Sequence, residues 1–179
     1  LRTFLALTVV LSHSYGHIFV GGRLAVQLFY IISGFLISYI LIEANSYKSL
    51  KGFYWNRILR LFPVYLFVSS LTLLLYFYQL TYLDQVDFFE TFKQLNLTGK
   101  IYLIFSNIFI LGQDLAFFMS VEGGNMIFNK NYTDSEPIIY QGLISHVTWT
   151  ISLEMCFYLI APFVLRNYRM LLSILFCSI

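Results

Sequence analysis

The first residues that suit chemistry are Arg2 and His13, which lie eleven positions apart in an apolar stretch. In a helix, eleven residues make three turns plus about 20°, so both side chains share one face, about 16 Å apart along the axis. An imidazole titrates near neutral pH and suits proton transfer. The alternatives are a basic anchor at the membrane edge for Arg2 and a hydrogen-bonded structural histidine for His13.

A metal site is a weaker alternative for the same stretch. His13 and His17 have the i, i+4 spacing of metal ligands. No Glu follows His13, however, and His146 is the one remaining histidine in the sequence. We therefore predict no metal site.

Arg57 and Arg60 form a second candidate site, because residues three apart share a helix face. Each guanidinium offers a planar fork of donors that matches phosphate oxygens. Pro63 and Tyr65 follow closely and are weak indications of a shaped site. The alternative is a generic basic flank on the cytoplasmic side of a membrane helix.

Glu154 is the third candidate, in the segment WTISLE that begins at Trp149, with Tyr158 one turn later. A carboxylate inside an apolar helix must face protein, water or a cation. It would orient an imidazole, pair with an arginine or form a structural ion pair, and Tyr158 is placed to hydrogen-bond it. Ser33, beside Gly34 in another apolar stretch, is predicted to let a neighbouring backbone approach closely.

Composition places these residues in a membrane protein. Apolar residues make up 59% of the chain, charged residues only 11%, and the mean hydropathy is +0.74. Soluble domains contain about 25% charged residues. Windows without charged residues cover 3–22, 24–42 and 61–83, each long enough to cross a bilayer core. The net charge of +2 is too small to indicate a nucleic-acid partner.

We predict an all-α, polytopic transmembrane bundle with about five to six helices in this chain. The chain begins inside one apolar run and ends inside another, so we expect it to be the N-terminal part of a single domain of a larger bundle, truncated at both ends. The helices expected from hydrophobic runs cover 1–17, 24–42, 58–80 and 147–165. The segment 44–56 reads as a polar connection, 81–100 as an amphipathic helix on the membrane surface and 119–146 as a loop.

The basic residues predict the orientation, with one conflict. The cluster of Lys48, Lys51, Arg57 and Arg60 places the connection before the third helix in the cytoplasm. Arg166 and Arg169 also favour the cytoplasm, but they would lie outside if 101–118 crossed the bilayer completely. Because Asn107, Gln113 and Asp114 are costly facing lipid, we favour a re-entrant segment.

These residues lie in four ordered blocks that resemble acyltransferase family 3. The blocks are Arg2-x10-His13; Gly22 to Ile37, ending SGFLI; Phe53 with the pattern RxxRxxPxY from Arg57 to Tyr65; and WTISLE followed by Phe157-Tyr158 and Pro162. The resemblance covers nearly the whole chain but only the N-terminal half of the family's domain. Gln27 and Tyr30 stand where the family often has an acidic residue and Phe, so any role of that acid is open here.

The resemblance implies a multi-pass enzyme of the bacterial inner membrane that transfers an acyl group, usually acetyl from acetyl-CoA, to a hydroxyl of a cell-surface carbohydrate such as lipopolysaccharide O-antigen or exopolysaccharide. Acyl-CoA would be a co-substrate, with no bound cofactor. By resemblance, His13, Arg2 and Glu154 would be catalytic and Arg57 and Arg60 would bind the CoA phosphates. Ser33, Tyr65, Trp149 and Tyr158 would support them.

The competing hypothesis is a multi-pass transporter or permease for a polar solute. Intramembrane Arg, His and Glu also occur in such proteins. Paired repeats with broken helices would favour it, and the sequence contains no visible repeat. Dependence on acyl-CoA separates the two hypotheses.

Overall fold

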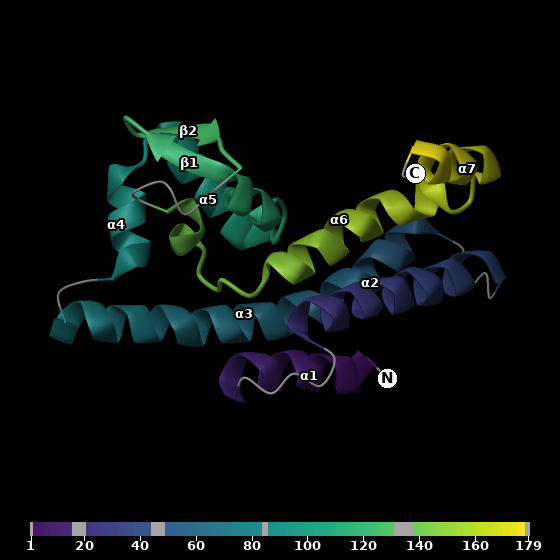
Figure 1. Cartoon of the computed structure of the whole chain (residues 1–179), viewed down its shortest axis with the longest axis horizontal. Helices are drawn as coiled ribbons and strands as arrows, with labels where there is room; N and C mark the ends of the chain where they lie inside the picture. Colours follow the sequence, from purple (N-terminus) through teal and green to yellow (C-terminus); the bar gives the residue numbers. More distant parts are fainter. Residues whose placement is uncertain (1, 16–20, 44–48, 84–85, 131–137, 178–179) are drawn as a thin grey trace. The chain divides into compact units, whose positions relative to one another are not determined.

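The computed structural model describes residues 2–15, 21–43, 49–83, 86–130 and 138–177, and these residues are mostly helical (Figure 1). They form two compact units. One contains residues 1–54 and 158–179, and the other contains residues 55–157. The candidate residues are distributed over both units.

In the first unit, helix α1 (Arg2–Tyr15) packs along helix α2 (Gly22–Ser38). The turn Tyr39–Glu43 extends α2 as a π-helix. The buried side chains recur at helical spacing: Leu5 and Thr8 on α1, Ala25, Ser33 and Ile37 on α2, and Leu41 on the π-helical turn. Helix α7 (Tyr168–Cys177) also belongs to this unit, and the Asn167 side chain accepts from the backbone N–H of Arg169 at its start.

Helix α3 (Leu50–Leu83) is 34 residues long, or about 51 Å at 1.5 Å per residue. It begins inside the polar connection predicted over 44–56, eight residues before the predicted helix start at 58. The physical reason is an N-terminal cap, because the Ser49 hydroxyl accepts from the N–H of Gly52. The helix continues through Pro63.

Two helical segments in the described part of the chain are long and apolar enough to cross a membrane, Leu24–Glu43 and Leu50–Tyr82. Only 22% and 11% of their apolar windows are buried within the structure. The core helix of a soluble protein would be mostly buried, and here large side chains such as Val64 and Phe67 are 66% exposed. The low burial therefore favours a lipid environment for both segments.

The segment 81–100, predicted as one amphipathic surface helix, holds the end of α3, the helix α4 (Asp87–Gln94) and the first turn of α5 (Leu97–Phe109). Helix α4 is amphipathic, but its apolar face packs against protein. Thr91 is 1% exposed, and the Phe88 ring stacks on Tyr76 of α3 with 5.4 Å between ring centroids. The apolar face of α4 thus has a protein partner, which the sequence pattern did not indicate, and its position on the membrane surface stays a prediction.

After α5 the chain turns and returns to the start of that helix. Ile110 and Gly112 adopt positive φ, a 3-10 helix covers Gln113–Phe118, and strands β1 (Met119–Glu122) and β2 (Asn125–Phe128) pair antiparallel. The Asn96 N–H then donates to the Gly124 carbonyl, and Asn96 Nδ2 donates to Asn125 Oδ1. The prediction of an all-α chain with a loop over 119–146 was therefore wrong over this hairpin.

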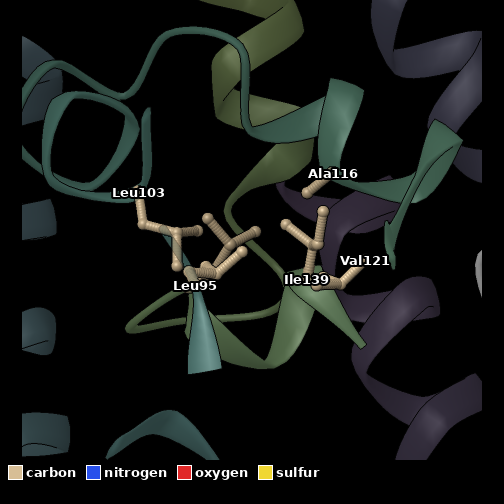
Figure 2. Packing of buried hydrophobic residues seen from close by; sticks show 6 residues of the cluster. Leu95, Leu103, Ala116, Val121 and Ile139 are labelled. Carbon is tan, nitrogen blue, oxygen red and sulfur yellow. The ribbon is translucent and has the colours of Figure 1, made fainter. Parts of the chain in front are cut away.

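The second unit has its own hydrophobic core. It gathers one side chain from each of several neighbouring segments (Figure 2). The core residues are Leu95, Leu103, Ala116, Val121, Ile139 and Leu143. These side chains hold several short segments of the second unit together. Leu103 of α5 is fully buried among them.

Candidate functional site

Helix α1 carries both Arg2 and His13 on one uninterrupted stretch of helix. Their backbone positions agree with the spacing argument, which requires a continuous helix between them. Their side chains lie outside the described part of the structure, so the shared face stays a prediction.

Ser33 on α2 is 2% exposed, and its Oγ donates to the Phe29 carbonyl at 2.8 Å. A Cβ placed on Gly34 would meet nothing within 4 Å among the described residues. The side of α2 that packs on protein is therefore the Ser33 side. The close approach of a neighbouring backbone at Gly34 stays a prediction.

Arg57 and Arg60 lie one turn apart near the start of α3, in different environments. Arg57 is 6% exposed, whereas Arg60 is exposed. Tyr65, further along the helix, is buried, and its hydroxyl donates to the Asn107 carbonyl on α5. The structure thus fixes Tyr65 through a contact that the sequence did not indicate.

Asn107 holds a backbone segment that leads to α6 (Trp149–Val164). Its Nδ2 donates to the Gly142 carbonyl at 3.0 Å, and its Oδ1 accepts from the Ile144 N–H at 2.9 Å. The Asn107 side chain therefore satisfies two backbone groups that a helix or sheet would otherwise pair with other backbone groups. It ties the segment before Trp149 to α5.

Gln113 is the centre of a buried polar network at the end of α5. The side chain is fully buried, and its Nε2 donates to the Ser106 carbonyl at 3.0 Å. Its Oε1 accepts from the Thr148 hydroxyl at 2.7 Å, and its backbone N–H donates to Ser152 Oγ at 3.1 Å. These bonds fix the first turn of α6 against the turn after α5.

The Ser152 hydroxyl extends this network to an acidic residue. It donates to Asp114 Oδ1 at 3.0 Å. Asp114 is partly exposed, and its Oδ2 makes no hydrogen bond within the described residues. One carboxylate oxygen is thus held in place while the other can accept a bond.

The remaining predicted residues lie on α6. Trp149 is partly exposed, and its ring meets Phe117 edge-on with 5.9 Å between centroids. Glu154 is 6% exposed and Tyr158 is 3% exposed. The Tyr158 ring packs edge-on against Phe53. A buried carboxylate on α6 agrees with the expectation that Glu154 faces protein rather than lipid.

Comparison with known proteins places the sequence pattern in a family. The model of the acyltransferase domain family matches residues 1–179. The chain belongs to this acyltransferase family. The family predicted from the four motif blocks is therefore confirmed.

Two curated relatives support the assignment to the acyltransferase family. Nodulation protein 10 of Rhizobium leguminosarum bv. viciae is 29% identical over 94% of this chain and 44% of its own length. An uncharacterized protein of Haemophilus influenzae is 29% identical over 78% of this chain and 47% of its own length. The chain spans about half the length of these relatives. No solved structure matches it significantly.

Sequence reasoning recognised the motif residues of this acyltransferase family but not the contacts that hold them. Asn107, Gln113 and Asp114 were noted only as polar residues in an apolar segment. Their polarity indicated that they form hydrogen bonds inside the protein, because buried polar groups need partners. Pairing Gln113 with Thr148 and Ser152 required knowing that the chain turns back after α5.

Proposed function

We propose that the whole protein is a membrane acyltransferase that transfers an acyl group, in the first instance acetyl, from acyl-CoA to a hydroxyl of a cell-surface carbohydrate such as O-antigen or exopolysaccharide. The observation that carries this proposal is the acyltransferase family match over residues 1–179. The apolar, mostly exposed helices Leu24–Glu43 and Leu50–Tyr82 support a location in the bacterial inner membrane. The helices of this chain would form part of a polytopic bundle.

The start of α3 supports the donor side of the proposal. The charge-free stretch 61–83 of this helix is long enough for a bilayer core. The segment 50–60 then extends about 16 Å beyond it and carries Arg57 and Arg60. The exposed Arg60 suits the phosphates of a soluble CoA thioester, and Arg57, one turn earlier and 6% exposed, would bind them from the protein side.

The roles of the catalytic residues follow from chemistry and from the family pattern. His13 would act as the general base that removes the proton from the acceptor hydroxyl, so that its oxygen attacks the acyl carbon. The thioester C–S bond would then break, and CoA would leave as the thiol with the proton returned by His13. Arg2, on the same helix, would polarise the thioester carbonyl. Glu154, buried on α6, would orient a cationic partner or bind the acceptor.

The return of the chain after α5 supports a consistent orientation. Helix α5 has 13 residues, about 20 Å, too short for a bilayer core of about 30 Å. Hydrogen bonds between Asn96 and the hairpin bring the chain back to the side where α5 begins. With 97–128 re-entrant from the outside, α6 leads back to the cytoplasm, where Arg166 and Arg169 belong.

The test uses the full-length protein in membranes with radiolabelled acetyl-CoA and glycans from the host's cell envelope. We expect label to enter a glycan fraction with the wild type and to fall by about 100-fold or more in His13→Ala, because general bases contribute about 100- to 10,000-fold. His17→Ala is the matched control and should retain transfer.

Two results would contradict the proposal at different points. Equal transfer by His13→Ala at normal membrane levels would remove the role of His13. No transfer by the wild type from any acyl-CoA would contradict acyl transfer itself, and solute uptake by the same membranes would then test the transporter hypothesis.

A further inference from the structure

The 3-10 helix Gln113–Phe118 has three distinct faces, because residues three apart eclipse one another in this helix type. Gln113 and Ala116 are fully buried and form the inner face. Leu115 and Phe118 are exposed, at 46% and 48%. Asp114 and Phe117 share the face between these two and are both partly exposed.

Aromatic rings surround the face that carries Asp114 and Phe117. The Phe117 ring stacks on Tyr140 with centroids 5.3 Å apart and planes 11° apart. Trp149 meets the same Phe117 ring edge-on. Phe117, Tyr140 and Trp149 are each partly exposed. The three rings, which we call the aromatic set, therefore offer apolar surface beside a carboxylate.

The Asp114 carboxylate is oriented by one hydrogen bond and has a second oxygen that can accept another. Ser152 fixes Asp114 Oδ1 at 3.0 Å, while Oδ2 makes no hydrogen bond within the described part of the chain. An ionised carboxylate accepts hydrogen bonds and donates none. A ligand for this position must therefore bring an O–H or N–H group, or a cation.

From this arrangement we propose that Asp114 and the aromatic set form the site that binds the carbohydrate acceptor. A sugar presents hydroxyl groups at its edge and C–H groups on its faces. The hydroxyls suit the open oxygen of Asp114, and the C–H faces suit the negative faces of aromatic rings. The proposal deepens the proposed function and rests on it, since it assigns the acceptor of the same reaction.

The position along the chain agrees with this assignment. Asp114 and Phe117 follow the turn after α5, at the inner end of the segment proposed to enter from the outside. Trp149 begins the helix that carries Glu154 five residues later. Ser152, which holds Asp114, lies between Trp149 and Glu154 in the same helix.

The experiment measures steady-state transfer by the full-length protein with oligosaccharides released from the host's cell envelope. The variants are Asp114→Asn and Phe117→Leu. A hydrogen bond to a charged group is strong enough for about a tenfold or larger change in binding. We expect the KM for the oligosaccharide to rise about tenfold in Asp114→Asn and several-fold in Phe117→Leu, with the KM for acetyl-CoA unchanged.

Two matched variants control for general effects of substitution. Phe118→Leu makes the same change on the exposed face of the same 3-10 helix, and Glu122→Gln removes an exposed carboxylate on β1. Both should leave the oligosaccharide KM unchanged. Because Phe117→Leu leaves the Asp114–Ser152 bond in place, it keeps the site testable if Asp114→Asn fails to fold.

Failure of this inference is distinguishable from failure of the proposed function. Normal oligosaccharide KM in both site variants of an active enzyme would overturn the site. A KM change for acetyl-CoA instead would also overturn it, because the site would then serve the donor. If the wild type transfers nothing, saturation-transfer NMR with the same oligosaccharides tests the site alone, and equal binding by wild type and both variants would overturn it.

Discussion

Replacing Asn107 is expected to destabilise the second unit more than its small size suggests. Its side-chain amide makes two hydrogen bonds to backbone, to the Gly142 carbonyl and from the Ile144 N–H. Gly142 is buried, so water does not readily replace the lost donor. Asn107→Ala removes both bonds, whereas Asn107→Asp keeps the acceptor and removes the donor.

The magnitude follows from the number of bonds and from the burial of Gly142. Two hydrogen bonds contribute about 1–3 kcal/mol together, and leaving the buried Gly142 carbonyl without a partner costs about a further 1–3 kcal/mol. We therefore expect Asn107→Ala to lower the free energy of unfolding by about 3 kcal/mol. Asn107→Asp should lose a similar amount, because a carboxylate would face the Gly142 carbonyl.

The assay is SDS-induced unfolding of the full-length protein in mild detergent, followed by tryptophan fluorescence. Asn125→Asp is the matched control. Asn125 is exposed and uses its side-chain oxygen as an acceptor for Asn96, which an aspartate retains, so its effect should stay within about 0.5 kcal/mol. If Asn107→Ala unfolds within 0.5 kcal/mol of the wild type, Asn107 does not hold this segment.

Three further substitutions test the packing and the donor site. In Gly142→Ala, the new Cβ would lie 2.3 Å from Leu103 Cδ1, so overpacking should cost about 1–3 kcal/mol in the same assay; Gly34→Ala, with nothing within 4 Å of its Cβ, should show no loss. Arg57→Lys and Arg60→Lys keep the charge but lose the guanidinium fork. We expect the KM for acetyl-CoA to rise several-fold with the oligosaccharide KM unchanged, and an unchanged KM for acetyl-CoA would argue against phosphate binding there.

The long helices were predictable because their signal is local. The apolar windows over 24–42 and 61–83 correspond to the two long helical segments, whose large apolar side chains remain mostly exposed, such as Phe35 at 70% and Leu74 at 65%. Hydrophobic runs of this length mark membrane helices whatever the rest of the chain does. Only the start of α3 was misplaced, since the capping Ser49 lies in a stretch that is polar and basic.

The candidate site was only partly predictable, because its contacts join residues far apart in sequence. The WTISLE segment indicated Trp149 and Glu154, but the partner of its Ser152 is Asp114, 38 residues earlier. Helix α4 was predicted to meet lipid because its amphipathic pattern is the same for a membrane surface and for a protein core. The hairpin β1–β2 has strands of four residues, too short for alternation to distinguish it from a loop.

The most direct test of the central claim is acyl transfer across sealed inside-out membrane vesicles that contain the full-length protein. Labelled acetyl-CoA is added outside, at the cytoplasmic face, and envelope oligosaccharides are enclosed in the lumen. The account predicts that label accumulates as an ester on the enclosed oligosaccharides while free CoA appears outside, and that neither happens with His13→Ala. Absence of labelled oligosaccharide with the wild type, in intact vesicles that hold folded protein, would contradict it.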